Sequence, residues 1–251
     1  MMISGVMMYS MHEVKSRSRR ENYKDNAILH FFSAHVSIYF TFIFVNLKMS
    51  ANAVTVLFFL TGFSGILFLS SFEGKVASLF YLAWRLHIIF DICDGEVARF
   101  FKKFTLNGVY WDYMIHSLLY PLYGIGICIH YYMSFSDVQF LYLAIGYSVT
   151  GSFLSGVKNN YSRALHEKGI TKESSKVRNT ARGKKLYIFN LVSASVGFEG
   201  FLLVNFVLIF FSYSSAGIIK YTLFTYLLTH AMIIAVKFLS LSKKGQYLAR
   251  N

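Results

Sequence analysis

The sequence predicts an all-α polytopic membrane protein, a bundle of six transmembrane helices that follows an N-terminal amphipathic helix at the membrane surface. Of the 251 residues, 55% are hydrophobic and 15% are charged, whereas soluble domains of this size carry about 25% charged residues. The charged residues gather in short blocks between long apolar runs. An apolar run of about 20 residues is the length that a helix needs to cross a bilayer. These observations exclude an ordinary soluble domain.

Residues 1–47 are expected to form a cytoplasmic and interfacial segment. A basic block within residues 12–26 precedes the apolar stretch 27–47, which His and Ser residues interrupt. An apolar stretch with such polar positions is typical of a helix that lies in the membrane interface. A seventh span over the same residues remains the alternative.

Residues 48–242 are expected to form one six-helix transmembrane domain, and residues 243–251 a short cytoplasmic tail. Each span is predicted from an apolar segment bounded by charged or turn-forming residues. The predicted spans are residues 51–72, 77–100, 108–132, 138–157, 187–212 and 216–240.

The distribution of Lys and Arg predicts which side of the membrane each loop occupies. With the N-terminus in the cytoplasm, 22 of the 25 basic residues fall on the cytoplasmic side, in agreement with the positive-inside rule. A net charge of +13 is also common in proteins that bind nucleic acid. Because the basic residues lie next to the spans, we expect them to contact membrane lipids, and we expect no nucleic-acid partner.

Acidic side chains within the second and third predicted spans are the strongest indication of function. On a helix, Asp91 and Asp94 share one face, and so do Asp112 and His116. The short loop between these spans makes the two helices antiparallel neighbours, so we expect the two polar faces to meet. An isolated Asp within a bilayer costs about 2.5 to 3.5 kcal/mol, and clustered carboxylates therefore need a compensating charge. Glu96 lies off this face and is expected to pair with a basic residue at the helix end.

The pattern predicts a site for magnesium, manganese or calcium, which oxygen ligands suit. Gly95, Ala98 and Gly108 leave room beside the acids, and Arg99 offers a bidentate donor for a phosphate. Metal, space and an arginine together favour a pyrophosphate ligand and phosphoryl transfer. A polar network that only joins two helices is the alternative.

This string of residues resembles the signature of the CDP-alcohol phosphotransferase family. The family pattern is Asp, two residues, Asp-Gly, two residues, Ala-Arg, eight residues, Gly, three residues, Asp, three residues, Asp. A weaker match upstream, from Ser50 to Thr55, resembles the Ser-Pro-Asn-x-x-Thr before the family's first core helix, with Ala51 in place of the proline. Seven of the eight fixed positions of the main pattern are present: Asp91, Asp94, Gly95, Ala98, Arg99, Gly108 and Asp112.

The resemblance implies six core helices, often in a homodimer, and two divalent cations, magnesium or manganese, that orient a CDP-linked alcohol. An acceptor hydroxyl attacks the phosphate and CMP leaves. One of the two substrates is a lipid, and the product belongs to phospholipid or lipid-linked glycan biosynthesis. The expected setting is a bacterial-type inner membrane, with the active site facing the cytoplasm. The implied metal ligands are Asp91, Asp94 and Asp112, and the residues implied to accommodate the CDP group are Asn52, Thr55, Gly95, Ala98, Arg99 and Gly108.

His116 stands where the family pattern has its fourth Asp. A neutral imidazole accepts a proton near neutral pH. It also binds metals, although it suits zinc or manganese better than magnesium. We expect His116 to serve with Asp112 as a catalytic residue and as a metal ligand. A catalytically impaired family member is the alternative.

Basic residues after the fourth predicted span are expected to contact the acceptor. The segment from Lys158 to Lys185 carries nine of them, and a solvated loop that only follows the positive-inside rule is the alternative. The candidate acceptor-binding residues are Lys158, Arg163, Arg178 and Arg182.

A non-enzymatic membrane protein, such as a divalent-cation transporter, is the competing functional class. A transporter is expected to place its acidic ligands near the membrane midplane, on broken or repeated helices. The sequence shows neither feature, so the enzymatic interpretation is favoured.

Overall fold

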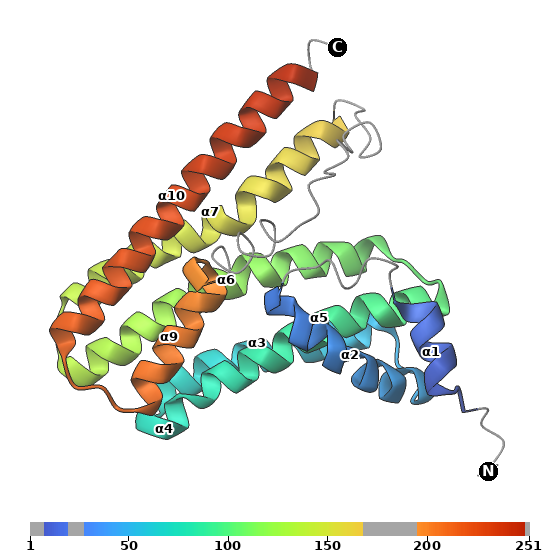
Figure 1. The fold of residues 1–251 in the computed structure, drawn as a ribbon, viewed down its shortest axis with the longest axis horizontal. Helices are drawn as coiled ribbons and strands as arrows, with labels where there is room; N and C mark the ends of the chain where they lie inside the picture. The colour runs from blue at the N-terminus through green and yellow to red at the C-terminus, as the bar shows by residue number, and fades with distance from the viewer. Residues whose placement is uncertain (1–7, 20–27, 168–194, 249–251) are drawn as a thin grey trace. The chain divides into compact units, whose positions relative to one another are not determined.

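The computed structural model describes residues 8–19, 28–167 and 195–248, and the regular elements in this part of the chain are all helices (Figure 1). The predicted all-α class is confirmed there. The chain divides into two compact units. One comprises the residues up to Gly65 together with Leu79–Ile115, and the other comprises Ile66–Ser78 together with the residues from His116 onward.

The first unit is centred on α5 (Leu79–Phe101), against which α1 (Met11–Ser18) and α2 (Ile28–Asn46) pack. It also contains most of α3 (Ala51–Ser71) and the beginning of α6 (Leu106–Phe135).

One apolar cluster holds the first unit together. Its members on α5 recur every three or four residues, so one face of that helix is apolar. Asp91 and Asp94 fall on the opposite face, because they are offset from this repeat. The buried members of the cluster are Val14, Ile38, Phe44, Val45, Val54, Ile89, Cys93, Val97 and Phe100.

The second unit is organised around the pairing of α10 with α7. At this contact the Tyr147 hydroxyl donates a hydrogen bond of 2.7 Å to the Leu223 carbonyl. The Tyr147 ring also stacks on Phe201 of α9, with ring centroids 4.7 Å apart. The elements of the unit are α4 (Gly74–Ala77), the remainder of α6, α7 (Gln139–Glu167), α9 (Phe198–Phe210) and α10 (Ala216–Leu248).

Tight backbone turns end α2, α5 and α9. Each turn contains a residue with φ between 50° and 54°, namely Lys48, Lys102 and Ser212. After α5, the Lys102 N–H bonds to the Arg99 carbonyl and the Lys103 N–H to the Ala98 carbonyl, at 3.2 and 3.0 Å. These two bonds are the Schellman pattern, which satisfies the last carbonyls of a helix and stops it. The chain therefore reverses within a few residues, and α6 begins beside the end of α5.

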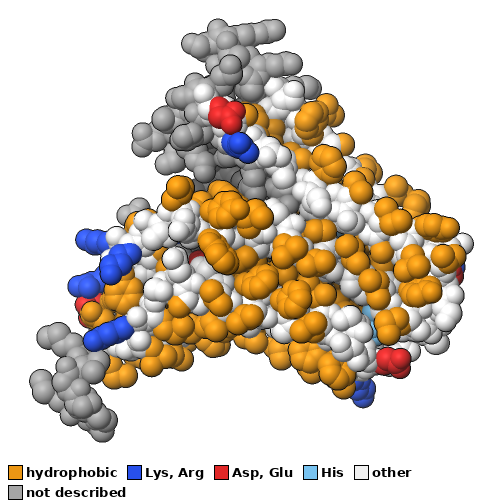
Figure 2. Space-filling model, turned by 180° about the vertical axis from the view of Figure 1, so that it is seen from behind, with side chains coloured by type: hydrophobic (Ala, Val, Ile, Leu, Met, Phe, Trp, Pro, Cys, Tyr) orange, Lys and Arg blue, Asp and Glu red, His pale blue; other side chains and the backbone are white. Residues whose placement is uncertain are grey.

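Three helices among the described residues are long and apolar enough to cross a bilayer: Ala51–Ser71, Gly74–Phe101 and Ala216–Ser242. They coincide with the first, second and sixth predicted spans. Hydrophobic side chains cover most of the described surface on the face drawn in Figure 2, and few charged side chains are in view. An apolar exterior of this kind suits contact with lipid, and the chain is accordingly a membrane protein.

The remaining predicted spans, and therefore the count of six, stay predictions. Residues 108–132 lie within α6, and all but the first residue of 138–157 lie within α7. Within 187–212 the structure describes the 13-residue helix α9. α2 matches the predicted helix over 27–47, but its length does not decide between an interfacial helix and a span. The loop expected from Lys158 begins later than predicted, because α7 continues to Glu167.

Candidate functional site

The turn between α5 and α6 is what brings the acidic residues of the two helices together. α6 starts at Leu106, and the Thr105 hydroxyl accepts a hydrogen bond of 3.0 Å from the Gly108 N–H. This is an N-cap, in which a side-chain oxygen satisfies a backbone donor of the first helical turn. With α5 stopped by the Schellman turn and α6 started by Thr105, Asp112 is carried back alongside Asp91.

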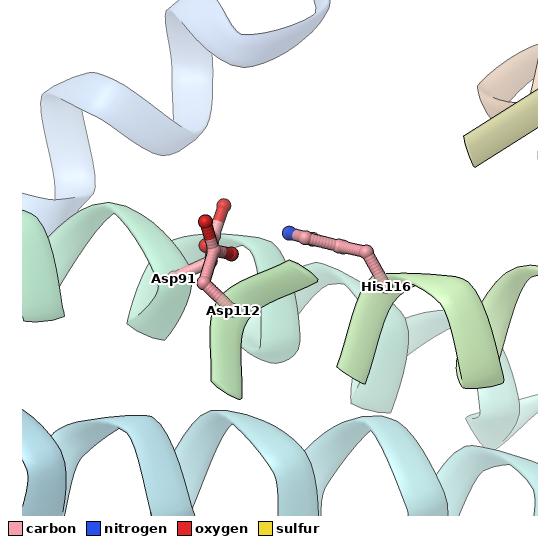
Figure 3. A group of neighbouring side chains, drawn as sticks. All are labelled: Asp91, Asp112 and His116. Atoms are coloured by element: carbon pink, nitrogen blue, oxygen red, sulfur yellow. The ribbon is translucent and has the colours of Figure 1, made fainter. Parts of the chain in front are cut away.

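Asp91, Asp112 and His116 form a compact group that could hold a metal ion (Figure 3). α6 is continuous through Asp112 and His116, which lie on successive turns. One carboxylate oxygen from each Asp and one ring nitrogen of His116 all lie within 4.8 Å of one another. Figure 3 shows the nitrogen pointing toward the two carboxylates. Two carboxylate oxygens no more than 4.8 Å apart repel by at least about 3.5 kcal/mol at an effective dielectric constant of 20, so a divalent cation fits this donor set.

Asp94 lies beside this group in a different environment. Its Oδ2 accepts a hydrogen bond of 2.9 Å from the Thr55 hydroxyl on α3. Its carboxylate is also within electrostatic reach of Asp91 and Asp112. The structure thus brings three of the four sequence-predicted metal ligands into one group and places the fourth next to it, bonded to α3.

A cavity of about 540 Å³ adjoins these carboxylates. Its volume is within the range of about 300 to 1,000 Å³ that is usual for small-molecule sites. All six residues expected to accommodate the CDP group line it, as do three of the four expected metal ligands. These lining residues are Asn52, Thr55, Asp91, Asp94, Gly95, Ala98, Arg99, Gly108 and Asp112.

Polar side chains approach two glycines closely at the cavity wall. A Cβ atom at residue 95 would lie 3.1 Å from Nη1 of Arg99. A Cβ atom at residue 108 would lie 3.1 Å from the Thr105 hydroxyl and 3.4 Å from Oδ1 of Asn52. The two distances of 3.1 Å are shorter than ordinary van der Waals contact, so an alanine at either position would require a small shift of Arg99 or Thr105.

Arg99 reaches from the cavity wall toward the N-terminal helix. Its Nε donates a hydrogen bond of 2.5 Å to the carbonyl of Ser18, the last residue of α1. The guanidinium nitrogens Nη1 and Nη2 lie against Gly95. Arg99 therefore faces the cavity while one of its donors is held by a segment far away in the sequence.

Two residues at this site were not expected from the sequence. Thr105 bridges Gly108 and Asn52, because its hydroxyl also donates to Oδ1 of Asn52 at 3.3 Å; a hydroxyl residue three positions before a motif glycine at a helix start is the signal that indicates it. Glu96 was expected to pair with a base at the helix end. It interacts electrostatically with Arg99 in the last turn of α5, but it is also 4% exposed and accepts a hydrogen bond of 2.6 Å from Thr41 of α2. The burial of Glu96 is revealed only by its contacts with other helices, because its position on α5 does not indicate it.

The four residues expected to bind the acceptor are only partly described. Lys158 and Arg163 lie on α7, and Arg163 forms an exposed ion pair of 3.2 Å with Glu167 one turn later. Arg178 and Arg182 fall within 168–194, outside the described residues. Their assignment as acceptor-binding residues remains a prediction.

Comparison with known proteins identifies a family for most of the chain. Residues 48–211 match the family model described as CDP-alcohol phosphatidyltransferase. The matched region begins just before α3 and includes the acidic group and the cavity, while α1 and α2 precede it. A search of curated proteins found no match.

Proposed function

The chain belongs to the CDP-alcohol phosphatidyltransferase family, and we propose that it transfers a phosphoalcohol or phosphatidyl group from a CDP-linked donor to an acceptor hydroxyl. CMP is the leaving group and a phosphodiester is the product. The observation that carries this proposal is that the motif residues of α5 and α6 line one cavity with Asn52 and Thr55 of α3. A nucleotide recognised by one end of the cavity would thereby present its phosphates to the acidic group.

The cavity residues suit a pyrophosphate. Arg99 offers planar N–H donors that match phosphate oxygens. Gly95 and Gly108 allow the helix backbones to approach the ligand closely. Asn52 and Thr55 supply polar side chains from α3 for the nucleotide.

The acidic group suits a divalent cation at the phosphates. We assign Asp91, Asp112 and His116 as its ligands, with Asp94 as a further ligand that Thr55 orients. When bound there, the cation supplies charge neutralisation for the phosphate oxygens in the transition state. We expect two ions of magnesium or manganese, and both the number and the identity of the ions are part of this proposal.

His116 is assigned the proton transfer, a step at which the ring nitrogen that faces the carboxylates has to be free of the cation. The acceptor hydroxyl forms a new bond to phosphorus while the bond from phosphorus to the CMP oxygen breaks, and the hydroxyl proton passes to His116. An imidazole is suited to this role near neutral pH. Asp112, one turn earlier on α6, holds the neighbouring negative charge that stabilises the imidazolium.

One of the two substrates is a lipid in this scheme, and the enzyme works at the cytoplasmic face of the membrane. The basic residues next to the spans support this orientation through the positive-inside rule. A second copy of the chain is the expected partner, because the family resemblance implies a homodimer in many cases.

Release of CMP by the purified protein tests the proposal. CDP-diacylglycerol and a set of soluble CDP-alcohols would each be incubated with membrane lipid extract and magnesium or manganese. We expect metal-dependent CMP release with at least one donor, lost in Asp91→Asn and Asp112→Asn. No release with any donor, together with divalent-cation uptake into vesicles that hold the protein, would instead establish the transporter class.

A further inference from the structure

The N-terminal helix α1 precedes the family-matched region, yet it is bonded to a residue of the family motif. Arg99 is tied to it through the Ser18 carbonyl. Arg17 of α1 lies over the Phe100 ring at 5.4 Å from the centroid. The Phe100 ring also meets Tyr9 edge-on at 4.9 Å. α1 is therefore held against the last turn of α5 along its length.

The opposite end of α1 is fixed to α2. The Tyr9 N–H donates a hydrogen bond of 2.8 Å to Oδ1 of Asn46, the last residue of α2. Val14 and Ser18 of α1 are both 0% exposed. The Ser18 carbonyl thus has a defined position, set by contacts at both ends of the helix.

Glu96 is a buried acidic residue that interacts with Arg99. It precedes Arg99 by three residues on α5, a spacing that makes the two side chains neighbours on the helix surface. Thr41 fixes one carboxylate oxygen by a hydrogen bond. The carboxylate interacts electrostatically with the guanidinium groups of Arg99 and Arg19, and Arg19 itself donates to the Ala34 carbonyl of α2 at 2.9 Å.

We propose that Glu96 and the Ser18 carbonyl are a pair of positioning groups that hold the Arg99 guanidinium against Gly95 at the wall of the donor cavity. α1 is then part of the donor site, although it lies outside the matched region. The proposal rests on the function assigned above, because it gives Arg99 the donor phosphates as its ligand.

The physical basis is preorganisation of a long, flexible side chain. A free arginine side chain loses rotamer entropy when it is ordered. Here a hydrogen bond fixes Nε and a buried carboxylate fixes the charge, so the ordering occurs before the ligand arrives. A donor that meets a preorganised guanidinium binds more tightly than one that must order it.

Binding of CDP to the purified full-length protein with Mn²⁺ tests the proposal. Glu96→Gln keeps the shape and the acceptor for Thr41 but removes the negative charge. Glu13→Gln is the matched control, because Glu13 is an acid of α1 whose ion pair is with Arg17. We expect a roughly tenfold weaker CDP affinity for Glu96→Gln, an unchanged affinity for Glu13→Gln, and a higher KM for the CDP donor with little change in kcat.

A double-mutant cycle separates positioning from a general structural role. If Glu96 acts through Arg99, Glu96→Gln will not weaken CDP binding further in an Arg99→Ala background. An equal loss in both backgrounds overturns the proposal, and so does an unchanged affinity in the single variant. Failure of the wild-type protein to bind CDP contradicts the proposed function instead. Should Glu96→Gln not fold, Glu96→Asp retains the charge at a shorter reach: weaker CDP binding with an unchanged unfolding midpoint supports the proposal, and unchanged binding overturns it.

Discussion

The Thr55 hydroxyl on α3 donates a hydrogen bond of 2.9 Å to Oδ2 of Asp94 on α5. This bond joins the segment that resembles the family's upstream motif to the acidic residues of its main motif. Thr55 is 4% exposed, so its side chain is largely shielded from bulk water. The two motifs therefore meet at one cavity, even though Thr55 and Asp94 are separated by 39 positions.

Thr55→Val should impair the site without unfolding the protein. The substitution keeps the shape of the side chain and leaves one carboxylate oxygen of Asp94 without this donor. Loss of a hydrogen bond to a charged group costs about 1.5 to 3 kcal/mol, so we expect roughly tenfold or greater loss of transferase activity. Thr61→Val is the control, because the Thr61 hydroxyl bonds to the Leu57 and Phe58 carbonyls of its own helix. Equal activity of the two variants would show that the Thr55 bond has no role at the site.

Gly108→Ala should weaken nucleotide binding. The added Cβ atom would lie 3.1 Å from the Thr105 hydroxyl, and overpacking of this kind costs about 1 to 3 kcal/mol. We expect at least roughly fivefold weaker CDP binding, measured by calorimetry. Gly217→Ala is the matched control, because a Cβ atom there meets nothing within 4 Å. If the Gly108 variant bound CDP as tightly as the wild type, the close packing around Thr105 would have no bearing on the ligand.

His116 substitutions should separate its two assigned roles. We expect His116→Ala to lose CMP release, because both the proton acceptor and a metal ligand are removed. His116→Asp restores the residue of the family pattern, and it should retain activity with a stronger preference for magnesium over manganese. CMP release measured with each metal tests both assigned roles of His116. Full activity in His116→Ala would exclude His116 from the chemistry.

The turn between α6 and α7 should contribute an acid-sensitive part of the stability. A hydrogen bond of 2.7 Å from Lys220 holds the pKa of Asp137 below its ordinary value near 3.8, and the N–H of Gln139 adds to the effect. A carboxylate with a lowered folded-state pKa stabilises the protein above the unfolded-state value, and this contribution is lost as pH falls through the folded-state pKa.

Asp137→Asn should therefore flatten the dependence of the unfolding midpoint on pH below about pH 4, compared with the wild type. The effect will be small, because the pair is near the surface and screened by solvent. Glu167→Gln serves as the control, since Glu167 belongs to an exposed ion pair elsewhere. Identical pH profiles for wild type and Asp137→Asn would contradict the assignment.

Local spacing predicted a large part of this site, and tertiary contacts account for the rest. The periodicity of a helix is enough to place Asp91 and Asp94 on one face, and a short loop is enough to bring Asp112 opposite them. The burial of Glu96 was not predicted, because its hydrogen-bond donor Thr41 lies 55 positions earlier in the chain. The bond between Arg99 and Ser18 spans 81 positions, and no sequence period indicates it.

The helix boundaries were likewise predicted in part. α3 and α5 were predicted to within a few residues, because their apolar runs end at charged or turn-forming residues. α7 was predicted too short, since its last turns are polar and a hydropathy pattern cannot distinguish a polar helix from a loop. The Schellman turn after α5 was also not predicted, because its central residue is Lys102 where glycine is usual.

Manganese binding to the purified protein tests the central claim most directly. Titration of Mn²⁺, followed by electron paramagnetic resonance with and without CDP, would compare the wild type with Asp112→Asn and Thr61→Val. The account predicts saturable binding that CDP strengthens in the wild type and in Thr61→Val, and a loss of at least roughly tenfold in Asp112→Asn. Equal Mn²⁺ affinity in all three proteins, or affinity that CDP leaves unchanged, would contradict a metal-assisted nucleotide site at Asp91, Asp112 and His116.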